Sequence, residues 1–258
     1  MTKNNHNAIL DPFLFVKSTL RNRLSLLKNY HTVLFCFDSS IYRKMKKINR
    51  GIIFSGLTGE LYLMDNKIAI AGNFGIGCPT TIAFLEELAA CGIKRFVGIG
   101  SAGALHNDIK LGDVVLCTGA FSDEGTSAHY PGYKLFSKPS HTLNAQLAVW
   151  FKKHQILFQK AKTWTIDAPY RETEQKLEYF IKAGARVVEM ESSAMFNVAR
   201  FRKVAVANMF VIGDSISDGT WKNKFESKDI KDTSRSVAKD IIHFLLDNPL
   251  QIHTRRST

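Results

Sequence analysis

Two glutamates separated by one residue stand where a predicted strand runs into a predicted helix. Residues 187–194 read VVEMESSA, so Glu189, Met190 and Glu191 directly precede the helical pattern SSAMFNVARF. Side chains alternate across a strand, and both glutamates are therefore expected on the same side. Carboxylates at a strand end often face a ligand in open α/β sheets. The alternative is a helix start that is capped by one of the two serines and favoured by nearby acids.

A glycine-rich segment leads into another helix earlier in the chain. Gly75 and Gly77 follow a predicted strand at 67–71, and Pro79 suits the first turn of a predicted helix at 80–91. Free backbone N–H groups at such a helix start suit an anion. A plain tight strand-to-helix turn is the alternative for the same pattern.

A second glycine-rich segment, GIGSAGAL, follows a predicted strand at 95–99. Gly98, Gly100 and Gly103 spell GxGxxG, but a turn and another strand at 113–117 follow instead of the helix that the dinucleotide fingerprint requires. We therefore exclude that fingerprint. The glycines are expected to form a tight bend that lets a ligand approach the backbone, with the Ser101 hydroxyl at its centre.

Strands and helices alternate along the chain without a break in composition. This pattern predicts an α/β fold, a single-domain three-layer α/β/α sandwich with a central mixed sheet. Residues 1–30 are expected to form an N-terminal lead-in, and residues 31–258 the domain. Residues 121–138 are predicted to be a long loop, which in a compact domain is usually functional. Further helices are predicted at 38–49, 143–154, 174–183 and 228–246, and further strands at 31–37, 52–54, 60–64, 162–166 and 204–212.

Composition narrows the class of protein. The chain has 258 residues, 45% of them hydrophobic, and no apolar run long enough to span a membrane, so we expect a cytoplasmic protein. The net charge of +12 comes from scattered residues, which favours a solvated basic surface over nucleic-acid binding. Four widely spaced cysteines indicate neither a metal cluster nor a disulfide framework, namely Cys36, Cys78, Cys91 and Cys117.

Five motifs in this order make the chain resemble the nucleoside phosphorylase/nucleosidase superfamily. This superfamily includes bacterial purine nucleoside and uridine phosphorylases and methylthioadenosine nucleosidases. The motifs are GIGCPTTIAFLEEL, GIGSAGAL followed by LGDVV, TIDAPYRET, VVEMESSA, and VIGD after the last strand. The resemblance implies cleavage of the N-glycosidic bond of a nucleoside through a ribosyl cation-like transition state. It also implies a homo-oligomer (dimer, trimer or hexamer) and no metal or organic cofactor.

The resemblance assigns the sugar side of the site to two of these motifs. Glu191 is expected to bind the ribose hydroxyls, and Met190 to pack under the sugar. Glu189 is expected to be a supporting or a base-side residue. Ser101 and Gly100 are expected to contact the nucleophile or the sugar.

The resemblance assigns the base side of the site to the motifs TIDAPYRET and VIGD. Tyr170 and Arg171 are expected to line the base pocket. Asp214 matches the position of the acid that purine-cleaving members direct at a base nitrogen, and Asp218 is the fallback. An aspartate at this position favours a purine, whereas TIDAPYRET is closer to uridine phosphorylase-like members.

The chain departs from the phosphate-binding pattern of the phosphorolytic members. Their early Gly-Asp-Pro-x-Arg turn reads FDSSI at residues 37–41, and Gly98 replaces an arginine. Arg50 is the only match for an arginine contributed by a neighbouring subunit. Phosphate contacts then fall to Gly77, Ser101 and Arg50, which form a weaker clamp than bidentate arginines.

Three functions remain open, and we put phosphorolysis first, with phosphate as co-substrate and free base and ribose 1-phosphate as products. The second is a nucleosidase that uses water, with Asp38 in place of the glutamate that activates water in hydrolytic members. The third is a protein that binds a nucleoside without cleaving it.

Overall fold

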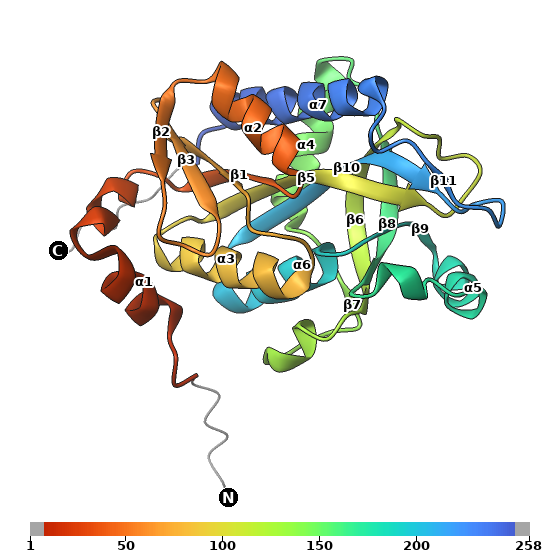
Figure 1. Cartoon of the computed structure of the whole chain (residues 1–258), viewed down its shortest axis with the longest axis horizontal. Helices are drawn as coiled ribbons and strands as arrows, with labels where there is room; N and C mark the ends of the chain where they lie inside the picture. Colours follow the sequence, from red (N-terminus) through yellow and green to blue (C-terminus); the bar gives the residue numbers. More distant parts are fainter. Residues whose placement is uncertain (1–7, 251–258) are drawn as a thin grey trace, which may run out of the picture.

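The fold is organised around one sheet that takes strands from the whole chain. In this computed structural model, residues 8–250 are described. Neighbouring strands follow the order β11-β10-β6-β8-β9-β5-β1-β4-β3-β2, and β7 pairs with β6 (Figure 1). The strand bounds are β1 Thr32–Cys36, β2 Gly51–Phe54, β3 Glu60–Met64, β4 Ile68–Gly72, β5 Arg95–Ala104, β6 Val114–Asp123, β7 Phe136–Ser137, β8 Gln159–Ile166, β9 Ala185–Glu189, β10 Ala205–Ser215 and β11 Lys222–Asn223.

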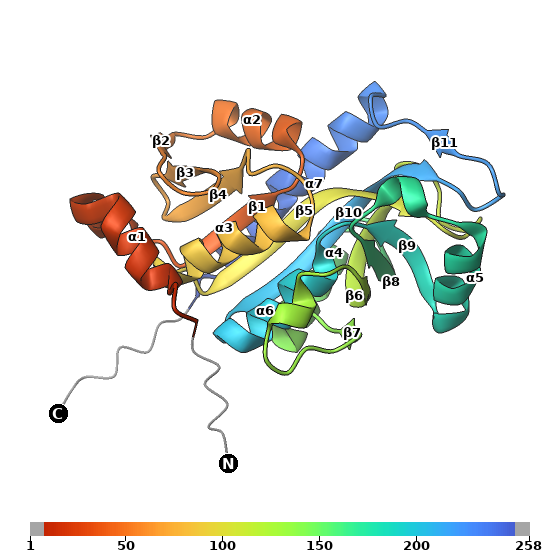
Figure 2. The same cartoon turned by 60° about the horizontal axis from the view of Figure 1, so that its bottom comes forward.

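Five of these strands close into a ring. β5 pairs in parallel with β10 and, at its carboxyl end, antiparallel with β9. Since β10, β6, β8 and β9 are consecutive neighbours, these four strands and β5 form a closed circuit, while β1, β4, β3 and β2 continue as an open sheet (Figure 2). The predicted α/β class with a central mixed sheet is confirmed. The ring was not predicted, because the sequence pattern of a strand does not show which other strand it pairs with.

Helices cover both faces of the sheet. On one side α3 contacts α1 and α6, and on the other α7 contacts α2 and α4 (Figures 1 and 2). An apolar core lies on each face of the sheet, and β1 contributes side chains to both. Val33 and Phe35 belong to one cluster, and Leu34 and Cys36 belong to the other. The helix bounds are α1 Pro12–Leu20, α2 Ser39–Ile48, α3 Cys78–Ala90, α4 His141–Lys153, α5 Glu174–Ala183, α6 Ser192–Arg202 and α7 Lys228–Asp247, with 3-10 segments η1 Arg21–Leu27, η2 Ser127–His129 and η3 Pro169–Arg171.

Local signals fix the bounds of α5. The Thr173 hydroxyl accepts a hydrogen bond from the Lys176 N–H at its start. At its end Gly184 adopts a left-handed φ of 98° and donates its N–H to Ile181. The helix therefore has the bounds that the sequence predicts, and it holds the end of the TIDAPYRET segment in place.

The N-terminal lead-in packs against the domain. Asp11 caps α1 by accepting N–H groups of the first turn. Val16, Leu20 and Leu27 are buried in the same apolar cluster as the residues of α3. Residues 1–7, also part of the predicted lead-in, lie outside the described residues.

The predicted long loop over residues 121–138 is wrong at both ends. β6 continues as far as Asp123 and pairs with β7 at Phe136. Between these strands the Glu124 carboxylate accepts hydrogen bonds from the Ser127 N–H and the Ser193 hydroxyl, which ties the turn to α6. The error arose because glycines and polar residues dominate the segment, while its pairing depends on residues farther along the chain.

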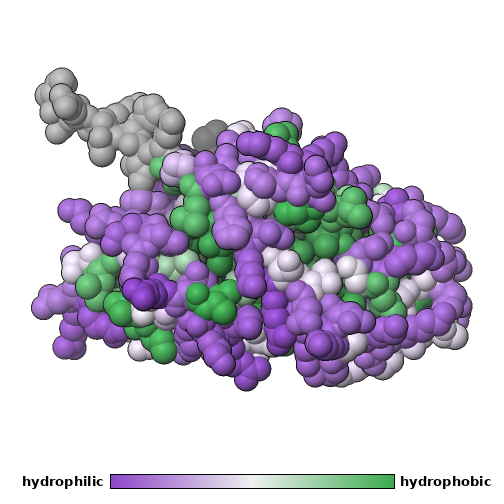
Figure 3. All heavy atoms as spheres, turned by 90° about the horizontal axis from the view of Figure 1, so that it is seen from above, coloured by the Kyte–Doolittle hydropathy of each residue, from purple (hydrophilic) through white to green (hydrophobic). Residues whose placement is uncertain are grey.

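The surface over α2 and α7 is mostly hydrophilic, with scattered apolar patches (Figure 3). Among residues 8–250, no helix combines the length and the apolar composition that crossing a membrane requires.

Candidate active site

The predicted site residues converge at the carboxyl end of β5. There Gly103 pairs with Asp214 of β10 on one side and with Val188 of β9 on the other. Just after Val188 the chain reaches Glu189, which ends β9, and then Glu191. The strand register therefore brings two chemically active segments, distant in sequence, to the two sides of one glycine, at the edge where open α/β sheets bind ligands.

Glu191 stands at the turn between β9 and α6 and is buried, with 7% of its surface exposed. One of its carboxylate oxygens accepts a hydrogen bond of 2.7 Å from the Gly77 N–H. Burial, followed by the nearby charge of Glu189, raises the pKa of Glu191 to about 8. Its carboxyl group is therefore held in a form that both donates and accepts hydrogen bonds near neutral pH.

Glu189 supports this turn from below. One of its oxygens accepts hydrogen bonds of 2.9 and 2.8 Å from the N–H groups of Glu191 and Ser192, and the other accepts from the Thr165 hydroxyl. Burial raises the pKa of Glu189. The expected serine cap of α6 is wrong, because the Glu189 carboxylate fills that position. Both oxygens of Glu189 are engaged, which fits a supporting residue better than a base-side ligand.

The glycine turn before α3 binds a carboxyl group of this chain. The Gly77 N–H, which was predicted to bind phosphate, donates its hydrogen bond to Glu191 instead. Next to it the Cys78 thiol donates to the Met190 carbonyl at 3.1 Å. Gly77 has a φ of 90°, a conformation that glycine adopts without strain. The turn thus joins α3 to the acidic segment and helps to hold Glu191 in place.

The glycines of GIGSAGAL do not form the expected tight bend. All three lie within the extended strand β5, and Ser101 is half-buried among them. A Cβ atom at Gly98 would come within 2.3 Å of an Asn208 side-chain oxygen, and at Gly100 within 2.8 Å of the Phe37 ring. The prediction failed because these glycines are required by side chains from other strands, not by backbone curvature.

Asp214 is the acid on the other side of Gly103. One carboxylate oxygen accepts a hydrogen bond of 2.9 Å from the Trp221 indole, and the other faces the space left by the missing side chain of Gly103. Burial raises the pKa of Asp214, and the indole opposes this rise. The fallback Asp218 is exposed, and hydrogen bonds from Lys222 and Thr220 lower its pKa to about 2. Of the two, Asp214 is the one whose surroundings favour the protonated carboxyl group.

Glu172 had no predicted role, and the structure brings it near Asp214. Burial, and then the charge of Asp214, raise the pKa of Glu172 to about 7. Two carboxyl groups with raised pKa values at one site are typical of acid–base chemistry. Glu172 belongs to the TIDAPYRET motif, but the surrounding residues Tyr170, Arg171 and Glu174 are exposed, so no local pattern indicated its burial.

Three other predicted residues, Tyr170, Arg171 and Arg50, are exposed, although Tyr170 and Arg171 stand directly before Glu172. Tyr170 is 99% exposed and Arg171 is exposed beside it in η3, so neither encloses a pocket in a single copy of the chain. Arg50 is exposed next to β2, the edge strand four places from β5 in the sheet. Met190 is half-buried and bonded through its carbonyl group to Cys78.

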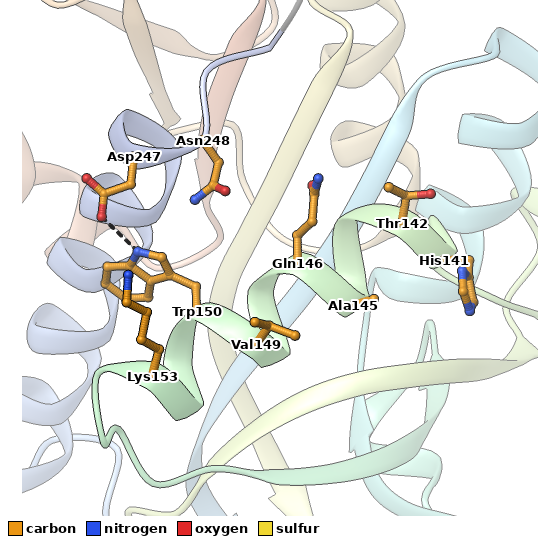
Figure 4. Close-up of a pocket in the computed structure, with 9 residues that line it drawn as sticks. All are labelled: His141, Thr142, Ala145, Gln146, Val149, Trp150, Lys153, Asp247 and Asn248. Carbon is orange, nitrogen blue, oxygen red and sulfur yellow. Dashed lines mark hydrogen bonds between the residues drawn. The ribbon is translucent and has the colours of Figure 1, made fainter.

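A surface hollow of about 880 Å³ lies elsewhere, between α4 and the end of α7 (Figure 4). The Trp150 indole donates a hydrogen bond of 2.8 Å to Asp247 in its wall. None of the predicted site residues lines it, and its lining is His141, Thr142, Ala145, Gln146, Val149, Trp150, Lys153, Asp247 and Asn248.

Comparison with known proteins covers most of the chain. A family model described as the phosphorylase superfamily matches residues 33–247. A guanosine phosphorylase of Halorubrum lacusprofundi is 25% identical over 67% of this chain and 72% of its own length. A uridine phosphorylase of Treponema pallidum is 29% identical over 68% of this chain and 73% of its own. The crystal structure of the Campylobacter jejuni 5'-methylthioadenosine/S-adenosyl homocysteine nucleosidase superposes with a TM-score of 0.71 at 16% identity, covering 84% of this chain and 99% of that one.

Proposed function

Because the chain belongs to the phosphorylase superfamily, we propose that it cleaves the N-glycosidic bond of a nucleoside, with a purine base favoured, and releases the free base. The observation that carries this proposal is that the strand register brings the half-buried Asp214 and the segment that holds the buried Glu191 to the two sides of Gly103. One group suits the sugar and the other suits the leaving base.

On the sugar side, a protonated Glu191 both donates and accepts hydrogen bonds, and a vicinal diol of ribose needs such a partner. The bond to Gly77 and the Glu189 support beneath it fix its orientation. A rigid partner of this kind can position the sugar for reaction.

On the base side, Asp214 acts as the general acid. Burial raises the pKa of Asp214 and so favours its protonated form, and the proton moves to a nitrogen of the leaving base as the bond from the sugar breaks. A purine offers a ring nitrogen on its imidazole part for this proton. Burial and then the charge of Asp214 raise the pKa of Glu172 to about 7, so Glu172 is a second group near Asp214 that can return the proton.

Two acceptors for the sugar are supported by specific observations. Phosphate, which would give ribose 1-phosphate, is supported by the relatives named guanosine and uridine phosphorylases. Water is supported by the apolar Phe37 ring beside β5 and by the carboxyl groups that already occupy the nearby helix starts. No metal or organic cofactor takes part in the proposal. The proposal includes a homo-oligomer in which a second copy of the chain covers the exposed Tyr170. Light scattering coupled to gel filtration tests the number of copies.

The test is base release from a panel of purine and pyrimidine nucleosides, together with the variant Asp214→Asn. We expect purine nucleosides to be cleaved, and Asp214→Asn to lose roughly a hundredfold or more in turnover while binding changes little, since only the acid is removed. Equal losses of turnover and binding would contradict the acid role. Nucleoside binding without release of any base would contradict catalysis itself.

A further inference from the structure

The helix starts at the carboxyl edge of the sheet already bind carboxylates of this chain. Asp38 accepts the Ser40 N–H at the start of α2. Glu191 accepts the Gly77 N–H at the start of α3, and Glu189 accepts two N–H groups at the start of α6. Helix starts are the positions where backbone groups would otherwise bind an incoming anion. Three such positions are therefore filled by carboxyl side chains of this chain.

The face of β5 beside Ser101 is covered by an aromatic ring. The Phe37 ring lies so close that a Cβ at Gly98 or Gly100 would approach its carbons to 2.9 or 2.8 Å. The Phe37 backbone is fixed by its N–H bond of 3.0 Å to Ile99. Its ring is held in an aromatic group, 6.2 Å from Phe74 between centroids. A dianion that approached β5 from this face would meet an apolar ring in place of hydrogen-bond donors.

Basic residues on these elements are engaged or exposed. Arg95 begins β5, at the opposite end from Ser101, and its guanidinium donates to the Asn248 carbonyl at 2.5 Å. Lys46 of α2 forms an ion pair of 2.8 Å with Glu60. Arg43 of α2 is exposed. By contrast, the start of α3 is surrounded by acids, since the charges of Glu124, Glu189, Glu191 and Asp167 all add to the burial that raises the pKa of Cys78.

From this geometry we infer that the acceptor for the sugar is water and that the chain is a nucleoside hydrolase, which excludes the phosphate dianion from the site. The inference rests on the proposed function and decides between its two acceptors. A neutral acceptor does not need the backbone N–H groups that these carboxyl groups already occupy, and it does not lose a dianion's hydration shell against the Phe37 ring.

The reaction balances without a further reactant. The bond between C1' of the sugar and the base nitrogen breaks, and its electron pair stays with the base. Asp214 gives its proton to the base. A water oxygen then forms the new bond to C1', and the proton that this water loses returns to Asp214 through solvent. The products are the free base and free ribose.

The experiment uses the full chain and the best nucleoside of the panel, in oxygen-18-labelled water, with and without millimolar phosphate. We expect equal rates in both buffers, one labelled oxygen in the ribose, and no ribose 1-phosphate by phosphorus NMR. Release that requires phosphate, or formation of ribose 1-phosphate, overturns the inference while leaving the proposed function intact. No release in either buffer refutes the proposed function instead.

A pair of variants tests the role of the ring. In Phe37→Gly the face of β5 is opened, and we expect millimolar phosphate, which leaves the wild-type rate unchanged, to inhibit hydrolysis roughly tenfold, the scale on which one pocket-forming group changes binding. The matched control is Phe74→Leu, which alters the same aromatic group without touching the Gly98 and Gly100 positions, and it should keep the wild-type response. An unchanged phosphate response in folded Phe37→Gly would overturn the assignment of this ring as the barrier.

Discussion

Replacing Trp221 by phenylalanine should move the pH dependence of base release. The indole N–H donates a 2.9 Å hydrogen bond to Asp214, and this bond favours the ionised carboxylate against the burial that raises its pKa. A hydrogen bond to a charged group contributes about 1.5–3 kcal/mol. Trp221 is 64% exposed, so water replaces part of the lost bond and the lower end of that range applies.

A loss of about 1.4 kcal/mol corresponds to roughly one pH unit, and its direction follows from the role of Asp214. Without the indole the proton is held more tightly, and an acid stays active to higher pH. The alkaline limb of kcat/KM, which reports the free enzyme, should therefore move upward by about one unit in Trp221→Phe. The assay is base release across a range of pH under conditions where substrate is far below KM.

The chain offers a matched control. Trp150 makes the same kind of bond, 2.8 Å to Asp247, in the hollow between α4 and α7 (Figure 4). Trp150→Phe should leave the alkaline limb in place. An unmoved limb in Trp221→Phe, with the protein folded and turnover retained, would show that Asp214 is not the acid or that the indole does not govern its proton.

Two further changes test other parts of the site. Burial raises the pKa of Glu191 from 4.5 to about 8, so the folded chain holds a proton that the unfolded chain releases, and the free energy of unfolding should fall as pH rises through that window. Glu191→Gln should flatten this fall in urea titrations and weaken both sugar binding and catalysis; a neutral result would remove Glu191 from the sugar site. Gly100→Ala should lower stability by about 1–3 kcal/mol, because its new methyl group would meet the Phe37 ring at 2.8 Å. In a double-mutant cycle Phe37→Ala should remove most of that loss, and simple additivity would argue against this contact.

The sequence contained enough information to find the segments of the site, because each has a local signature. α5 has its predicted bounds because Thr173 and Gly184 are strong start and stop signals within the helix itself. VVEMESSA was recognised as a strand-to-helix turn for a similar local reason, since two acids and two serines interrupt an apolar strand. Even there the prediction named the wrong cap, because a serine hydroxyl and the Glu189 carboxylate both suit the start of α6 and only the fold decides between them.

The sequence did not show which residues of distant segments contact each other across the ring of strands. The bond from Gly77 to Glu191 joins residues 114 positions apart, and it changes the meaning of both motifs: the apparent anion-binding turn holds the acid that was expected to bind sugar. The contact of Gly100 was equally hidden. Its glycine predicted a flexible turn, whereas the structure shows the Phe37 ring packed against it. A glycine in a strand records the approach of a neighbour but not the neighbour's identity. Here that identity is chemically decisive, because an apolar ring at this position favours a small neutral acceptor over a phosphate dianion.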